Sequence, residues 1–518
     1  MKALPNPLYT GLTQSSTQNS FGGLNRRSSA SDGEIIDMKN MSSDETPLIA
    51  PRKPRTIISQ SVDNNGIYAL DGLFEVIGTV AYYKGKNVGT VLNSKKTISA
   101  LGSKIVILPD KVYYDVATDE FASIESTVLN QKVKFQDGEY AGADAKANTI
   151  YSKDFVWKDY FKVGDAVTIT GAFLHTQNNQ TIVVREIEGD CLRFYENSFT
   201  IGTTGDDETV TISRTMPDLD YICENDNRLF GCKGDTVYAS KLGDVTNWNV
   251  FDGIASDSYA VDVGSPGDFT GCITYLGYPV FFKEDVIYKL YGSQPSNFQL
   301  MRSASLGVSP GDSKSLAVAG EILFYMSRVG IVAYSGATPS SVFLPFNDEK
   351  FTDSVAGSDG RKYYVSMKKT NGQHILAVYD TVFNTWHIED DTEALGFAYL
   401  DGLYIMTPTS VLLVNGAGSE TINSYVEFAD ETLSTPNKKS VSKIAIRCTV
   451  FDEATLEVKI SYDSGEWQTV KTLPGNSKRS YYLPVIPHRC DHFRIRLEGS
   501  GRYIVHSITR EYSYGSMN

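Results

Sequence analysis

A repeat of short apolar strands is the feature of this sequence that most restricts its fold. Each unit consists of an apolar strand, a tight polar turn, a second apolar strand and an aromatic-rich third strand, as in 272–290. From residue 221 onward the units recur at intervals of roughly 40–50 residues, which is the length of one four-stranded propeller blade. A single blade cannot bury both of its faces, so several must stack around an axis. We therefore predict an all-β, multi-domain protein built on a β-propeller of about six or seven blades.

Two further regions have their own strand patterns. The gap between the second and third units is too long for a loop, and its alternating segments 165–171 and 181–187 predict an inserted small β-barrel. Strict alternation in 441–450 and 455–462 predicts a C-terminal β-sandwich with one wet face. The predicted organisation is an extended N-terminal docking arm (1–60), the first part of the propeller (61–120), the barrel (121–215), the remaining blades (216–417) and the sandwich (418–518).

Composition agrees with many short strands. The 518 residues include 31 Tyr, 24 Phe and 43 Gly, and aromatic residues favour strands while glycine favours the turns between them. No stretch approaches the roughly 18–20 apolar residues of a membrane helix, and the first residues lack the apolar region of a signal peptide. We expect synthesis in a cytoplasm and no membrane segment.

The N-terminal 60 residues combine polar, proline-interrupted sequence with apolar side chains that are costly to leave in water. A disordered tail is the simplest alternative, but we expect an arm that becomes ordered against a neighbouring surface. Its predicted assembly interface consists of Phe21, Leu24, Ile35 and Met38. Basic residues in the same segment are candidate contacts for DNA or an acidic partner, the alternative being a solvated surface: Arg26, Arg27, Arg52, Lys53 and Arg55.

Motifs that carry chemistry are missing from the sequence. It has no nucleophile elbow, phosphate-binding loop or H-E-x-x-H pair, and its six cysteines include no C-x-x-C. His488, Cys490 and His492 lie close together, but their segment is typical of a turn that enters a strand. Ser461–Trp467 resembles a β-turn motif of sialidase-like propellers, with the tryptophan one residue early. We therefore predict no metal, no cofactor and no enzymatic activity.

Several segments resemble a known family. Phe21–Asn25, Asp32–Ser43, Asp226–Cys232, Val237–Asn249 and Asp257–Ser265 are similar to the signature of phage and prophage stabilisation proteins. The resemblance covers most of the chain in patches and indicates the tail-nozzle and packaged-DNA stabilisation proteins of short-tailed bacteriophages. It implies a propeller with additional β domains, in a ring, usually sixfold, below the portal and adaptor. Such a ring retains packaged DNA and guides its ejection.

The resemblance sets the expected partners. They are other copies of the chain in a hexameric ring, the portal, adaptor and other tail proteins, and the viral double-stranded DNA in transient, non-specific contact. The expected location is the virion tail, after synthesis in the host bacterial cytoplasm. A net charge of −14 suits a conduit that lets DNA slide without gripping its phosphates. Two alternatives stay open: a host-receptor or glycan-binding propeller at the tail tip, and a sugar-cleaving tailspike-like enzyme.

Overall fold

The computed structural model describes residues 13–136, 148–195, 199–201, 207–435 and 437–514. These residues form strands joined by turns and five short 3-10 helices, and the described part contains no α-helix. Two compact units divide the chain, one made of Met1–Val62 and Gly311–Asn518 and the other of Asp63–Pro310. The predicted fold class, an all-β protein with propeller blades, is confirmed by the sheets described below.

The Asp63–Pro310 unit contains four four-stranded antiparallel sheets of the propeller-blade type. In each sheet the strands lie side by side in sequence order, and the first strands of successive sheets contact one another. The second strand of a blade is covered on both faces: Ile105, Val106 and Ile107 are all fully buried. The four sheets are β6 (Asn64–Ala69), β7 (Leu73–Ile77), β8 (Val80–Tyr83) and β9 (Lys86–Thr90); β10 (Thr97–Leu101), β11 (Lys104–Leu108), β12 (Val112–Asp115) and β13 (Glu120–Ser123); β20 (Tyr221–Asn225), β21 (Arg228–Lys233), β22 (Thr236–Ala239) and β23 (Tyr259–Asp262); and β24 (Gly271–Tyr275), β25 (Tyr278–Lys283), β26 (Val286–Tyr291) and β27 (Gln299–Ala304), with the 3-10 helix η3 (Pro295–Asn297).

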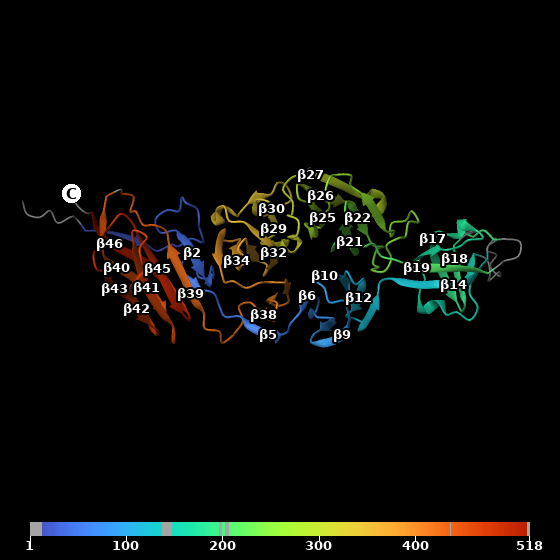
Figure 1. Ribbon diagram of the computed structural model, residues 1–518, viewed down its shortest axis with the longest axis horizontal. Coiled ribbons are helices and arrows are strands. Elements are labelled where there is room, and N and C mark those ends of the chain that lie inside the picture. Colours follow the sequence, from blue (N-terminus) through green and yellow to red (C-terminus); the bar gives the residue numbers. More distant parts are fainter. Residues whose placement is uncertain (1–12, 137–147, 196–198, 202–206, 436, 515–518) are drawn as a thin grey trace, which may run out of the picture. The chain divides into compact units, whose positions relative to one another are not determined.

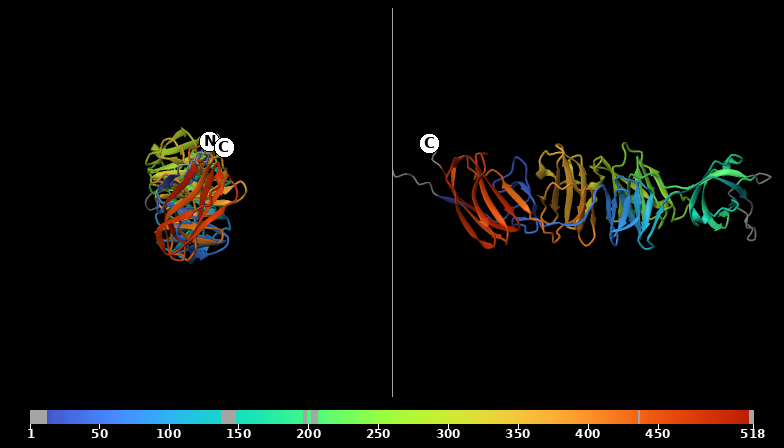
Figure 2. Two further views of the ribbon diagram at one scale, coloured as in Figure 1. Left: turned by 90° about the vertical axis from the view of Figure 1, so that its left-hand side faces the viewer. Right: turned by 60° about the horizontal axis from the view of Figure 1, so that its bottom comes forward.

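Between β13 and β20 the chain forms a closed six-stranded barrel, shown in cyan and green in Figures 1 and 2. Its strands enclose a separate apolar core in which Trp157, Phe194 and Ile212 are fully buried. The barrel strands, Ser126 to Arg214, fall within the range 121–215. They are β14 (Ser126–Gln136), β15 (Thr149–Tyr151), β16 (Ala166–Thr170), β17 (Thr181–Glu188), β18 (Cys191–Phe194) and β19 (Glu208–Arg214), with η1 (Trp157–Asp159) and η2 (Thr176–Asn178).

The other unit contains three more blades, so the described residues form seven in all. The last blade takes its fourth strand from far back in the chain: β5 (Thr56–Gln60) pairs antiparallel with β38 (Ser410–Leu413). The remaining strands are β28 (Ala317–Ala319), β29 (Ile322–Ser327), β30 (Gly330–Tyr334) and β31 (Ser340–Ser341); β32 (Phe351–Ser358), β33 (Lys362–Lys369), β34 (His374–Asp380) and β35 (Thr385–Ile388); and β36 (Gly396–Tyr399) and β37 (Leu403–Met406), with η4 (Ser313–Ser315) and η5 (Leu344–Phe346).

Two five-stranded sheets make up the C-terminal part of this unit, and each has a strand from the N-terminal segment at its edge. β1 (Gln14–Gln18) pairs with β46 (Tyr503–Tyr514), and β2 (Ile35–Lys39) pairs with β39 (Asn423–Phe428), where Figure 1 shows blue beside orange. The other strands are β40 (Lys439–Val450), β43 (Ser477–Pro484) and β44 (Arg489–Cys490) in the first sheet, β45 (Phe493–Ser500), β41 (Thr455–Tyr462) and β42 (Gln468–Pro474) in the second, and the small pair β3 (Met41–Ser42) and β4 (Ala50–Pro51).

This arrangement corrects the prediction of a docking arm for a neighbouring subunit. Phe21, Leu24, Ile35 and Met38 are 2–4% exposed and belong to the core that the sandwich shares with the adjacent blades. These apolar side chains do require a covering surface, because their exposure to water is unfavourable in free energy. The surface that covers them, however, is part of the same chain.

Candidate ligand-binding site

A polar concavity of about 650 Å³ lies on the outer face of the sheet β2-β39-β45-β41-β42, and we call it the sandwich cleft. Successive side chains of a strand point to opposite faces. Val426, Val458 and Leu497 are fully buried and face the core, so their neighbours Tyr425 and Arg496 lie on the outer face with the cleft. The N-terminal segment also contributes to the lining, through Lys39 at the end of β2 and Asn40 after it.

Ion pairs join the charged side chains on this face. Arg496 Nε lies 2.8 Å from Glu498 Oε1, and Lys459 Nζ lies 2.7 Å from the other oxygen of Glu498. Lys459 also reaches Glu457 at 3.1 Å. The hydrogen bond to Glu498 raises the pKa of Lys459, although burial opposes it. Burial raises the pKa of Glu427, although Arg494 and Arg496 favour its charged form. The face therefore carries many charges that are paired within it.

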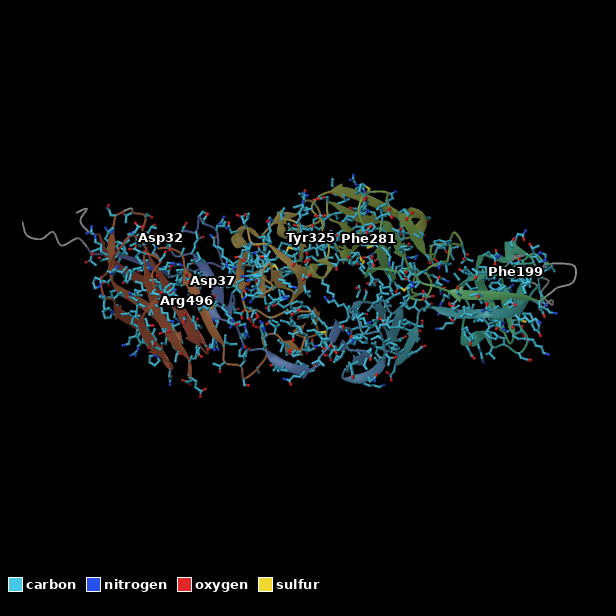
Figure 3. All side chains as sticks on the ribbon, in the orientation of Figure 1. Asp32, Asp37, Phe199, Phe281, Tyr325 and Arg496 are labelled. Carbon is cyan, nitrogen blue, oxygen red and sulfur yellow. The ribbon has the colours of Figure 1, made fainter. Side chains whose placement is uncertain are left out.

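Tyr425 has a fixed position at the edge of the sandwich cleft. Its hydroxyl donates a hydrogen bond of 2.7 Å to Asp37 Oδ2 on β2. The Arg496 guanidinium lies 4.1 Å from the centre of its ring, a cation–π contact. Burial and the Asp37 carboxylate raise the pKa of Tyr425. Figure 3 labels Asp37 on β2 and Arg496 on β45, and β39, which carries Tyr425, lies between these two strands.

A second concavity, of about 390 Å³, shares Lys39 and Tyr425 with the sandwich cleft. It lies where β2 and β39 meet the blade β32–β35, and His374 is part of its lining. The Nδ1 atom of His374 is buried and has no hydrogen-bond partner in the described part of the chain. The two concavities thus have Lys39 and Tyr425 in common. The sequence contains a signal for this face, namely alternation along 423–428, but nothing that singles out Tyr425.

Three of the five basic residues predicted to contact DNA or an acidic partner form ion pairs with carboxylates of the same chain. Arg26 pairs with Asp37 at 2.6 Å and Glu349 at 2.7 Å. Arg52 pairs with Glu420 at 2.9 Å and Asp390 at 3.3 Å, and Arg55 with Glu389 and Asp390. These contacts correct the expectation that the three residues are available to an outside partner.

The other two basic residues are at the surface. Arg27 is exposed, with its Nε 2.9 Å from Asn25 Oδ1. The side chain of Lys53 is 62% exposed and lies 3.9 Å from Asp44. The five basic residues therefore do not form one basic surface: three are paired with carboxylates of the chain and two are exposed to solvent.

The histidines near Cys490 make separate contacts. His492 Nε2 lies 3.0 Å from Ser464 Oγ, His488 packs against the ring of Tyr462, and the Cys490 thiol donates to the Lys439 carbonyl. Across the described ranges, no group of three or more histidine, cysteine or acidic side chains is placed to hold a metal ion. The same residues contain no helix that is long and apolar enough to cross a membrane.

Comparisons with known proteins found solved structures of low similarity. No family model and no curated protein matches it. An exo-β-1,3-galactanase from Phanerochaete chrysosporium is 10% identical, with 56% of this chain and 94% of that chain covered and a TM-score of 0.20. PorZ, a surface component of the type-IX secretion system of Porphyromonas gingivalis, is 13% identical, with 87% of this chain and 71% of that chain covered and a TM-score of 0.27. A glycoside hydrolase family 43 arabinoxylan arabinofuranohydrolase from Bacillus subtilis is 9% identical, with 89% of this chain and 96% of that chain covered and a TM-score of 0.17.

These matches correct one expectation from the sequence. Two of the three are glycoside hydrolases, so the prediction that the chain has no enzymatic activity does not stand. Their names concern carbohydrate, and none of the three mentions a phage tail. At TM-scores of 0.27 and below these matches identify no ligand, and the ligand has to be argued from the side chains of the chain itself.

Proposed function

We propose that this protein is a structural subunit of a bacteriophage tail, part of a ring that extends the DNA-exit channel below the portal and adaptor. The proposal rests on the resemblance described above together with one observation. Residues that carry the resemblance are the ones on which the fold itself depends. A chain that shares them is expected to share the architecture of the family as well.

The N-terminal signature illustrates this dependence. Phe21 and Leu24 are 4% and 3% exposed, and the Leu24 amide donates to the Trp386 carbonyl at 2.7 Å. A Cβ atom added to Gly23 would lie 2.5 Å from that same carbonyl oxygen. The segment therefore fits against β35 only with glycine at position 23, which explains the sequence of the signature in structural terms.

The signature segments of the Asp63–Pro310 unit are equally internal. The Arg228 guanidinium is buried and donates to the carbonyls of Ser240 at 2.8 Å, Ala255 at 2.6 Å and Asp257. Trp248 is 2% exposed and donates from Nε1 to the Val245 carbonyl at 2.9 Å. These contacts fix the long connection between β22 and β23.

The experiment that tests the proposal is a cryo-electron-microscopy reconstruction of particles that contain this protein, focused on the portal-to-tail axis. A closed ring of the chain around the axis, with DNA density ending in or above it, is the expected result. A position at the periphery, away from the axis, would overturn the channel function.

Binding of a host glycan at the tail surface is a second candidate function, and the sandwich cleft favours it. Its lining is polar and includes an aromatic ring held in place by two partners. The carbohydrate-related names among the structural matches agree with this second function better than with the first. Binding of oligosaccharides to the isolated protein distinguishes the two, because a channel subunit does not require it.

A further inference from the structure

We infer that the sandwich cleft binds a neutral oligosaccharide, with the ring of Tyr425 as the surface on which a sugar packs. This inference specifies the ligand of the second candidate function and is independent of the ring proposal. It is carried by three observations: the chemistry of the lining, the pairing of its charges and the fixed position of Tyr425.

The lining has the hydrogen-bonding character that a sugar requires. The described residues around the sandwich cleft include no aliphatic side chain. Sugar hydroxyl groups both donate and accept hydrogen bonds, and hydroxyl and amide side chains do the same. Four exposed side chains of this kind line the cleft: Thr421, Asn423, Thr455 and Thr472. A largely apolar ligand would offer these groups no hydrogen-bond partner.

The carboxylates of the lining favour a neutral ligand over a cation. Each of its three carboxylates already has a cation beside it: Glu420 has Arg52 at 2.9 Å, Glu457 has Lys459 at 3.1 Å, and Glu498 has Arg496 at 2.8 Å. A cation entering the cleft would have to compete with these pairs for a carboxylate. A neutral polyol can accept and donate hydrogen bonds without disrupting them.

Tyr425 provides the apolar part of the site. Its hydroxyl is held by Asp37 and its ring by Arg496, so little side-chain entropy remains to be lost when a ligand packs on it. Because Tyr425 lines both concavities, an extended ligand that spans them passes this ring. The volumes, about 650 and 390 Å³, are within the range of small-molecule sites.

The test uses the full chain and an array of neutral and acidic oligosaccharides, followed by calorimetric titration with the neutral oligosaccharide that gives the strongest signal. We expect Tyr425→Ala to weaken binding about tenfold or more, because the ligand loses the aromatic ring on which it packs. Tyr425→Phe keeps the ring and should lose much less. Asn423→Ala, at an exposed side chain of the lining, tests the hydrogen bonds without touching the core.

The matched control is Tyr482→Ala, on β43 in the opposite sheet, whose side chain is 70% exposed. It should bind like the unmodified chain, and thermal unfolding should show that all four variants are folded. Three results would overturn the inference: no neutral oligosaccharide bound at millimolar concentration, equal binding by Tyr425→Ala, or a preference for acidic oligosaccharides. None of these results affects the position of the chain in the particle, so failure here is separable from failure of the ring proposal.

Discussion

Arg55 Nη2 lies 2.5 Å from Glu389 Oε2, and both side chains are buried, at 6% and 7% exposure. Asp390 lies 2.8 Å from the same guanidinium. Burial lowers the pKa of Arg55, but the two carboxylates outweigh it and raise the pKa above its ordinary value. This ion pair joins the segment just before β5 to the residue that directly follows β35, more than 330 residues away in sequence.

Replacing Arg55 by leucine should destabilise the protein by about 3–5 kcal/mol, because Glu389 would be left buried without a cation and Asp390 would keep only Arg52. Urea unfolding measures the change. Lys53→Leu is the matched control, since Lys53 is exposed and only 3.9 Å from Asp44, and it should change stability by less than about 0.5 kcal/mol. Equal effects of the two substitutions would show that the buried pair contributes little.

Gly23→Ala should destabilise the protein by about 1–3 kcal/mol, because the added methyl group overlaps the Trp386 carbonyl and Thr385 Cβ. At the adjacent Gly22 an added Cβ meets nothing within 4 Å, so Gly22→Ala is the control and should be nearly neutral. Thermal unfolding of the two single variants compares them directly. A tolerated Gly23→Ala would contradict the close approach of this segment to β35.

Arg228→Met should destabilise the protein by about 3 kcal/mol, because the buried carbonyl groups of Ser240 and Asp257 and the part-buried carbonyl of Ala255 would lose their donor. Arg228→Lys should restore only part of the loss, since an ammonium group lacks the planar fork of a guanidinium. Hydrogen exchange along the β22–β23 connection locates the effect. Arg302→Met, at an exposed position on β27, is the control and should leave exchange unchanged.

His387 predicts a pH dependence of stability. Burial, with a smaller contribution from Lys362, lowers the pKa of His387 from 6.5 to about 4. The unfolded chain therefore binds a proton at a higher pH than the folded chain does, and stability falls as the pH falls from about 6.5 toward 4. We expect this residue to account for a loss of about 2 kcal/mol between pH 7 and pH 5.

His387→Gln should remove that contribution, which urea unfolding at the two pH values can measure. His488→Gln, at an exposed position, should retain the pH dependence of the unmodified chain. The interpretation fails if His387→Gln loses as much stability between pH 7 and pH 5 as the unmodified chain does.

The blades were predictable because their signals are local. In the hairpin of β20 and β21, Cys223 pairs with Phe230, so the pairing strands and the turn are contiguous in sequence. The role of the N-terminal segment was not predictable, because its partners are hundreds of residues away. Apolar side chains such as Phe21 indicate that a covering surface exists, but they do not indicate whether the same chain supplies it. The candidate site was missed for the same reason, since Asp37 and Tyr425 meet only through the pairing of β2 with β39.

Because the first described strand pairs with the last, this part of the fold cannot form until nearly the whole chain has been synthesised. Gln14 and Tyr512 are 498 residues apart and pair directly in β1 and β46. At roughly 5–20 residues per second, a ribosome needs about 25–100 s to make the chain between them. For most of that time Phe21, Leu24 and Ile35 have emerged, but the segments that cover them, around Trp386 and Phe428, do not yet exist. The nascent chain therefore presents these apolar residues to the cell before it can bury them, and a chaperone that binds there would have to release them last.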